Sequence, residues 1–370
     1  MKIIITGQNG FIGSHLYNNL SYRFNDVELV EFEKSLFNNQ EKLDNLIRTS
    51  DIIIHLAGIN RHKDQDFLFN QNILLSNHII SSIERTNFKG KVIFASSIQE
   101  SVDNAYGKSK KKSRELFMLA ANQNNFSFDG LIIPNVFGPF CKPNYNSFIA
   151  TFCNNIVNGE KIFIKEDKEI QLIYIDNLIT EIMNCINTDK GLKKTIKEDL
   201  TISVSEVKDI IESFYELYYK KGIVPKLDSN FKLNLFHTFV SYIKFDSFYP
   251  KQYKLVSDPR GSFAEVMRSN ILGQYSYSVT LPGEIRGNHF HTRKFERFSV
   301  ISGSGVIEIR KIDSEKKYIY KLNGKTPSYV DMPIWYTHNI KNTGDIPLIT
   351  LFWINEFYDE ADSDTFFEKV

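Results

Sequence analysis

Tyr106 and Lys110 stand four positions apart, in a segment whose pattern predicts the start of a helix. A four-residue step places a phenol and an ammonium group on one helix face. Because a nearby cation lowers the pKa of a phenol, we expect Tyr106 to exchange a proton with a carbonyl or alcohol oxygen while a nicotinamide exchanges hydride with the carbon. Ser97, which ends a predicted strand, can hold the same oxygen with its hydroxyl group. The Tyr/Lys spacing is common by chance, so its meaning depends on the motifs around it.

Three glycines with GxxGxxG spacing follow the first apolar run of the chain and open a predicted helix. Such glycines permit a tight turn, close approach of the backbone to a pyrophosphate, and close packing of helix on strand. The N–H groups at the start of the helix then face the phosphates. The pattern predicts a dinucleotide site, which we assign to Gly7, Gly10, Phe11, Ile12, Gly13 and, from the HLAG segment, Leu56, Ala57 and Gly58.

The second predicted strand ends near Glu31, Glu33 and Lys34, where a residue should meet the adenosine ribose. An acid there binds the 2′-hydroxyl group and favours NAD, whereas Lys34 can pair with the 2′-phosphate of NADP. These residues alone leave the choice between NAD and NADP open.

A second group of potential ligands lies in the last third of the chain: His289, His291, Glu296 and His338. Two histidines at i and i+2 on a strand point to one face, and Glu296 and His338 can close the set from neighbouring strands. Three imidazoles and one carboxylate suit a borderline divalent metal, with Zn²⁺ as the first choice.

The elements that must position these residues follow from the hydrophobic pattern. Up to about residue 135, short apolar runs alternate with helical segments, which predicts βαβ units and a parallel sheet. Residues 145–243 are mostly helical in pattern, with Gly222 as a helix stop. After residue 246 short strands alternate with turn residues. We therefore expect an α/β Rossmann-type doubly wound sheet with a helical substrate region at 1–245, and an all-β barrel at 246–370.

The composition limits the other classes of protein. The chain has 370 residues, 45 basic against 44 acidic, so no net field recruits nucleic acid or an anionic membrane. Three cysteines cannot form a disulfide framework. No apolar run approaches the roughly 20 residues of a membrane span, and no signal-peptide pattern opens the chain. We expect a cytoplasmic protein with a small-molecule partner, without nucleic acid or membrane insertion.

Combined with HLAG at 55–58 and the strand-ending pair of serines, these motifs resemble the extended short-chain dehydrogenase/reductase family of nucleotide-sugar enzymes, over about residues 1–240. The resemblance implies catalysis by Ser97, Tyr106 and Lys110, and it places Asn135 at the sugar-nucleotide site. Many members have an Arg shortly before that Asn, where this chain has two isoleucines, so another pocket residue must replace it.

The 4-epimerases and 4,6-dehydratases of this family are the main competing assignments. The dehydratases need an Asp-Glu pair just after the active-site hydroxyl group. Here Ser97 is followed by Ile98, Gln99 and Glu100, which argues against dehydration.

The spaced His/Glu pattern resembles both motifs of the cupin family, with Trp335 where the second motif usually has Gly. The run from Asp258 to Glu265 is similar to the substrate-binding strand of cupin deoxysugar 3,5-epimerases. By that similarity Arg260 can pair with a diphosphate and Glu265 can contact the nucleotide, although a structural salt bridge in a turn explains these residues equally well.

The fusion of the two parts, joined by the segment CKPNYNS at 141–147, resembles the bifunctional capsular-polysaccharide enzymes of the UDP-N-acetyl-L-fucosamine pathway. The resemblance implies a UDP-linked 4-keto-6-deoxy amino sugar as substrate. The cupin part epimerises it at C3, and the reductase part then reduces C4 with NADPH, giving the L-talose product. It also implies a homodimer, because cupins commonly pair through their sheets.

The chemistry of such a fusion is consistent, because a 4-keto group acidifies the C3–H bond and a metal can hold the developing negative charge while a base moves the proton. Tyr336, Lys294 and a water molecule on the metal are all candidates for this base. Two other hypotheses remain. The cupin part could be a dimerisation or substrate-docking module of a chain that is only a reductase, or the whole chain could be a nucleotide-sensing scaffold without activity.

Overall fold

This computed structural model describes residues 1–188, 193–253, 255–258, 261–264, 273–356 and 359–370. The chain forms two compact units, of which the first comprises residues 1–152 and 163–207 and the second residues 153–162 and 208–370. The helical segment after residue 207 thus groups with the β region, whereas the change in sequence pattern predicts a boundary between residues 245 and 246. That boundary stays a prediction of where two domains would separate.

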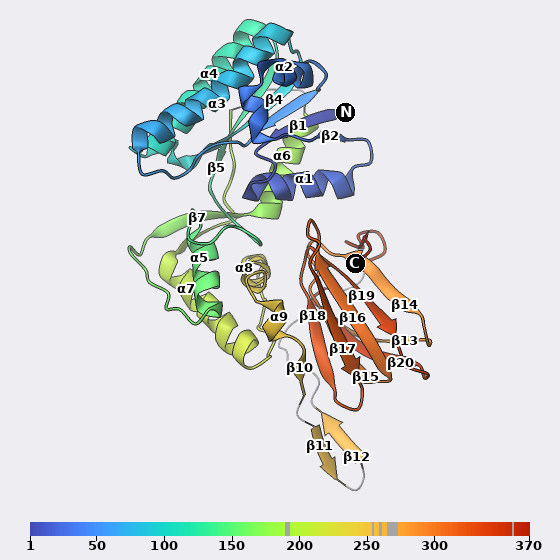
Figure 1. The fold of residues 1–370 in the computed structure, drawn as a ribbon. Helices are drawn as coiled ribbons and strands as arrows, with labels where there is room; N and C mark the ends of the chain where they lie inside the picture. The colour runs from blue at the N-terminus through green and yellow to red at the C-terminus, as the bar shows by residue number, and fades with distance from the viewer. Residues whose placement is uncertain (189–192, 254, 259–260, 265–272, 357–358) are drawn as a thin grey trace. The chain divides into compact units, whose positions relative to one another are not determined.

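The first unit is built on a six-stranded sheet in which every pairing is parallel (Figure 1). Its strands, in spatial order, are β2 (Glu28–Val30), β1 (Lys2–Thr6), β3 (Ile52–His55), β4 (Lys91–Ser97), β5 (Ser127–Ile133) and β8 (Lys193–Thr195). The central strands are nearly continuous apolar runs because both faces of the sheet are covered. The predicted Rossmann-type sheet is confirmed.

Helices cover both faces of this sheet (Figure 1). One side carries α2 (Gln40–Arg48), α3 (Gln65–Thr86) and α4 (Ala105–Asn124), and the other α1 (Phe11–Arg23) and α6 (Ile175–Ile186). Side-chain caps fix two of the helix starts, since Asp64 accepts from the Phe67 N–H at 2.9 Å and Asn104 from the Gly107 N–H at 2.7 Å. None of the described helices is long and apolar enough to cross a membrane.

The region predicted to be mostly helical contains strands as well. A small sheet consists of β6 (Asn135–Phe137), β7 (Glu169–Tyr174) and β9 (Leu200–Ser203). Besides α6, the helices of this region are α5 (Phe148–Val157), α7 (Val204–Phe214), the π-helical turn η3 (Tyr215–Lys220) and α8 (Asn230–Val240), and α9 (Phe245–Phe248) follows shortly after it. Gly222 adopts a φ of 67° just after η3, as its predicted role of helix stop requires.

The β region of the second unit consists of two five-stranded sheets and a hairpin, and its pairings are antiparallel (Figure 1). One sheet has the order β10 (Lys251–Gln252), β18 (Ser328–Met332), β15 (Glu296–Ser302), β20 (Leu348–Ile354), β13 (Gln274–Thr280). The other has the order β17 (Lys317–Asn323), β16 (Ser304–Lys311), β19 (Tyr336–Asn342), β14 (Ile285–Phe290), β21 (Phe366–Phe367). The hairpin is β11 (Leu255–Asp258) and β12 (Gly261–Ala264).

A buried ion pair fixes the start of β15. The Arg297 guanidinium donates to both carboxylate oxygens of Asp331, at 2.7 and 2.9 Å, and both residues are almost fully buried. The hydroxyl groups of Tyr218 and Tyr249 donate to the same carboxylate. Because each charge has a partner, this pair holds the helical segment of the second unit on its sheet without an isolated buried ion.

Candidate functional site

The glycine turn after β1 has the close contacts that its spacing predicts. Gly7 has a φ of 76°, and its carbonyl oxygen accepts from the Gly10 N–H at 2.9 Å. A Cβ atom on Gly13 would lie 2.1 Å from that same oxygen. Gly10 caps α1 through its backbone alone, and no acidic residue stands in the first turn. The N–H groups at the start of α1 are therefore a favourable site for an anion.

The HLAG segment lies beside this turn. The Leu56 N–H donates to the Thr6 carbonyl oxygen and the Ala57 N–H to the Thr6 hydroxyl oxygen, both at 3.2 Å. A Cβ atom on Gly7 would lie 3.0 Å from the Ala57 nitrogen, so glycine is needed for this approach. The fold thus brings the glycine turn and residues 56–58 to one edge of the sheet, which is where both predicted parts of the dinucleotide site should meet.

A cavity of about 550 Å³ opens at the end of β2, lined by Glu31, Glu33, Ser35, Leu36, Asn39, Lys42, Asn45 and Leu46. Lys34 begins the short helix η1 (Lys34–Asn38) and is exposed. The Ser35 hydroxyl group donates to the Glu33 carboxylate at 3.1 Å. Acidic residues (Glu31 and Glu33) and a basic one (Lys34) therefore lie near the predicted position of the adenosine ribose, as the choice between NAD and NADP requires.

The Tyr/Lys pair stands at the start of α4, next to the carboxyl end of β4. The ammonium group of Lys110 donates to the Ala95 carbonyl oxygen at 2.9 Å and lies 5.9 Å from the centre of the Tyr106 ring. A Cβ atom on Gly58 would be 3.3 Å from the same ammonium nitrogen. Ser97 is half-buried two residues after Ala95, and its hydroxyl oxygen accepts from the Gln99 N–H at 3.2 Å. Lys110 therefore joins the Tyr106 helix, the Ser97 strand and the HLAG segment.

The protonation of this pair differs from the sequence-based expectation. Burial raises the pKa of Tyr106 to about 12, with a smaller effect of Tyr145, so the expected lowering by Lys110 is wrong for the protein alone. Burial also lowers the pKa of Lys110 to about 8, against an opposing effect of Glu100. At neutral pH Tyr106 is a phenol and Lys110 an ammonium ion, which is the arrangement needed to donate a proton to a carbonyl oxygen.

Two further residues, Gly107 and Asn72, position the Tyr106 helix, and no motif in the sequence predicted them. A Cβ atom on Gly107 would lie 1.9 Å from the Gln99 carbonyl oxygen, so this glycine lets α4 pack on the turn that carries Ser97. The buried side chain of Asn72 donates to the Ile59 carbonyl oxygen and to the Ser109 hydroxyl oxygen, both at 2.9 Å, and so joins the HLAG segment to α4. The glycine after Tyr106 was a readable signal, whereas nothing near Asn72 in the sequence distinguishes it.

The Glu100 carboxylate is already bound. It accepts from Arg114 at 2.8 and 2.7 Å, and the Ser96 hydroxyl group donates to it as well. This pairing agrees with the argument against a dehydratase, because it leaves Glu100 as a structural anion rather than a free acid.

Of the three predicted substrate-binding residues, the structure describes one, Asn135. Asn135 is exposed on β6, where its amide group donates to the Gln171 carbonyl oxygen at 3.1 Å. Arg260 and Glu265 lie outside the residues that the structure describes.

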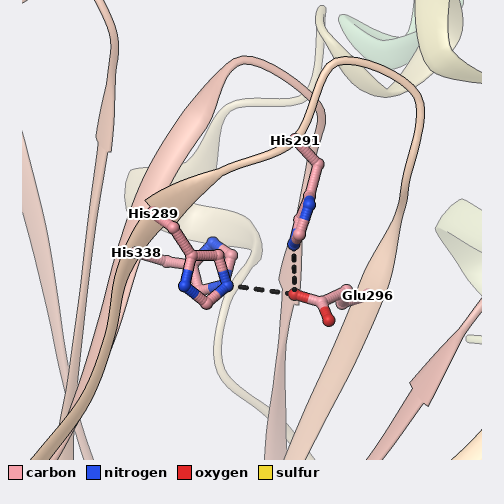
Figure 2. A group of neighbouring side chains, drawn as sticks. All are labelled: His289, His291, Glu296 and His338. Atoms are coloured by element: carbon pink, nitrogen blue, oxygen red, sulfur yellow. Dashed lines mark ion pairs between the residues drawn. The ribbon is translucent and has the colours of Figure 1, made fainter. Parts of the chain in front are cut away.

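The four predicted metal ligands come together in the second unit (Figure 2). One ligand atom from each residue lies within 4.8 Å of the others. His289 on β14 is opposite His338 on β19 in the sheet register. Glu296, the first residue of β15, places one carboxylate oxygen 3.3 Å from His291 Nε2 and 3.1 Å from His338 Nε2. His289 and His338 thus come from paired strands of one sheet, and His291 is the residue after β14. Glu296 comes from β15 of the other sheet, and not from a neighbouring strand as predicted.

This group fits a divalent cation. The Nε2 atoms of His291 and His338 and the Oε2 atom of Glu296 are buried and make no hydrogen bond in the described part of the chain. Burial lowers the pKa of His289 to about 3, and the charges of the other two histidines act in the same direction. Burial would raise the pKa of Glu296, but His291 and His338 hold it well below its usual range. Three imidazoles and a carboxylate that converge on one point form a donor set suited to Zn²⁺.

Trp335 resolves the departure from the second cupin motif. It adopts a φ of 62°, the left-handed conformation for which glycine is usual. Its side chain is 4% exposed and stacks on Phe290, with ring centres 5.6 Å apart. Trp335 therefore adopts the left-handed turn conformation that a glycine would favour, and burial of the indole ring offsets the backbone strain.

Lys294 and Tyr336, the two side chains considered as the base for C3, both make contacts with other residues. The ammonium group of buried Lys294 donates to the Ser363 carbonyl oxygen at 2.7 Å and lies 3.5 Å from the Glu356 carboxylate. The Tyr336 ring packs edge-on against Phe245, and burial raises its pKa above the usual range. Both side chains are therefore engaged in contacts within the second unit.

Known proteins match both parts of the chain. Residues 3–196 match the NAD dependent epimerase/dehydratase family, and residues 256–366 match the polysaccharide biosynthesis C-terminal domain. A relative from Pseudomonas aeruginosa, named UDP-2-acetamido-2,6-beta-L-arabino-hexul-4-ose reductase, is 33% identical over 99% of this chain and 98% of its own length.

Solved structures agree with this. The capsular polysaccharide assembling protein CapF from Staphylococcus aureus is 32% identical, with a TM-score of 0.64 over 100% of both chains. RMD from Pseudomonas aeruginosa, solved with NADPH, is 16% identical with a TM-score of 0.53 over 58% of this chain and 84% of its own, so the two chains share a fold over that part. The chain therefore belongs to the NAD dependent epimerase/dehydratase family, in a form that also carries the polysaccharide biosynthesis C-terminal domain.

Proposed function

We propose that the first unit reduces C4 of a UDP-2-acetamido-2,6-dideoxy-4-hexulose, with NADPH preferred over NADH. The observation that carries this proposal is the position of Lys110, which meets Tyr106, the HLAG segment and the strand of Ser97 at one edge of the sheet. The full-length relative named as a hexulose reductase supports the substrate class.

In this proposal a bound NADPH supplies the hydride to C4. Tyr106 donates its proton to the C4 oxygen, so the carbonyl gains one hydride and one proton and becomes an alcohol. Lys110 holds positive charge beside the phenol and stabilises the tyrosinate that is left, and the Ser97 hydroxyl group holds the same oxygen. The exposed Lys34 supports NADPH, because it follows the strand end at which a 2′-phosphate would lie.

We further propose that residues 246–370, which hold the β region of the second unit, form a cupin that epimerises the same sugar at C3 before the reduction, giving the L-talose configuration. His289, His291, Glu296 and His338 would hold the divalent cation, and Zn²⁺ is the one we expect. A cation there supplies positive charge for the sugar oxygen on which negative charge develops when the acidic C3–H bond breaks. The four converging ligands support this part of the proposal.

Incubation of the protein with a UDP-4-keto-6-deoxy sugar in D₂O tests both activities. Deuterium should enter C3 without cofactor, and NADPH should be oxidised when it is added. His338→Ala should abolish the exchange at C3. If exchange is absent from the wild type, or if His338→Ala exchanges normally, the second unit is a docking or dimerisation module and the chain is only a reductase.

A further inference from the structure

The last residues of the chain pack directly against the strand that carries a metal ligand. In β21, Phe366 pairs with Phe290 and Phe367 with His289 of β14. The Glu368 N–H donates to the Asn288 carbonyl oxygen at 2.9 Å. The chain end therefore forms one border of the His/Glu group, although no residue of that group belongs to it.

Asp364 makes the closest contact from this segment. It is 6% exposed and has a φ of 42°, which is strained for a residue with a side chain. Its carbonyl oxygen accepts from His291 Nδ1 at 2.7 Å. Because a carbonyl oxygen can only accept, Nδ1 carries the proton and the Nε2 lone pair faces the other ligands.

The Asp364 carboxylate holds the residues that follow His291. It accepts from the Thr292 N–H at 3.1 Å, the Thr292 hydroxyl group at 2.5 Å and the Arg293 N–H at 2.9 Å. One buried residue thus fixes both the imidazole and the backbone that carries it. Charge-assisted hydrogen bonds of this kind are stronger than neutral ones, so they can keep Asp364 in its strained conformation.

We propose that Asp364 is a positioning residue for the metal centre, which it serves by setting the tautomer and orientation of His291. This inference rests on the proposed metal binding. The outer partners of metal-binding histidines commonly contribute about 10–100-fold to metal affinity, and Asp364 is in that position for His291. The segment at the end of the chain is accordingly part of the metal site.

The test measures Zn²⁺ affinity by competition with a chromogenic chelator, and the absorption bands of Co²⁺ in the same site. Asp364→Ala and Asp364→Gly keep the carbonyl oxygen that accepts from His291 but lose the carboxylate that holds Thr292 and Arg293. The backbone that carries His291 is then less fixed, so both variants should bind Zn²⁺ about tenfold more weakly and shift the Co²⁺ bands. Glycine removes the backbone strain and alanine keeps it, so equal losses assign the effect to the carboxylate. Asp364→Asn keeps one oxygen acceptor and should lie between these variants and the wild type.

Asp362→Ala is the matched control, because Asp362 is exposed on the same segment and its carboxylate pairs with the Arg293 side chain. It should bind Zn²⁺ as the wild type does. If the wild type binds no Zn²⁺, the proposed metal function fails. If the wild type binds it and the folded Asp364→Asn and Asp364→Gly variants match its affinity and Co²⁺ spectrum, the metal function stands and the positioning role is refuted. An equal loss in Asp362→Ala would also refute it.

Discussion

The backbone N–H of Trp335 donates to the carbonyl oxygen of His291 at 2.8 Å, so a residue in a left-handed conformation holds one of the predicted metal ligands. The contact needs only the backbone of residue 335. The side chain contributes by burial against Phe290.

Replacing Trp335 by Gly and by Ala separates these two contributions. Loss of a buried Trp costs about 3–5 kcal/mol, while glycine recovers about 1–2 kcal/mol of left-handed strain. We therefore expect both variants to be less stable than the wild type, and Trp335→Ala less stable than Trp335→Gly by about 1 kcal/mol. Denaturant unfolding with a chelator present measures this, and an alanine variant as stable as the glycine variant would contradict the account.

The pKa of Lys110 predicts the pH dependence of the reduction. Its value of about 8 means that the ammonium form is present below that pH and is lost above it, whereas Tyr106 keeps its proton to about pH 12. The kcat/KM for ketone reduction should therefore fall as pH rises through about 8. Because Glu100 raises the pKa of Lys110, Glu100→Gln should move the fall to lower pH. A profile that stays flat to strongly alkaline pH would exclude Lys110 as the titrating group.

Gly10 and Gly13 should respond differently to a methyl group. A Cβ atom on Gly13 meets backbone at 2.1 Å, so Gly13→Ala should unfold more easily by about 1–3 kcal/mol. A Cβ atom on Gly10 would approach the Gly7 oxygen at 3.1 Å, a much looser contact. Gly10→Ala should therefore fold but bind NADPH about tenfold more weakly, because the methyl group obstructs the pyrophosphate. Thermal unfolding and cofactor titration distinguish the two. If Gly10→Ala binds NADPH normally, this turn does not hold the pyrophosphate.

Lys34 should select the cofactor. Lys34→Ala should raise the KM for NADPH about tenfold and leave that for NADH almost unchanged, because only NADPH has the 2′-phosphate. Lys42→Ala is the comparison, since Lys42 lines the neighbouring cavity. If Lys42→Ala raises the KM for NADPH and Lys34→Ala does not, Lys42 is the residue that contacts the 2′-phosphate.

The features that the sequence predicted best are local ones. The strands and the glycine turn follow from the spacing of residues within one element. The four predicted metal ligands lie close together, although Glu296 joins them from the other sheet. The raised pKa of Tyr106 could not be predicted, because burial is a property of the folded chain. The same holds for Asn72, which acts on Ser109, and for Asp364, which reaches His291 across 73 positions. The homodimer stays a prediction.

The central claim is that Tyr106 donates the proton when C4 is reduced. The direct measurement is NADPH oxidation by the wild type and Tyr106→Phe with the UDP-4-keto sugar as acceptor, together with NADPH affinity for both. We expect the wild type to oxidise NADPH in proportion to the sugar consumed, and Tyr106→Phe to bind NADPH equally well but to react at least about 100-fold more slowly. A phenylalanine variant that reduces the sugar at the wild-type rate would contradict the account.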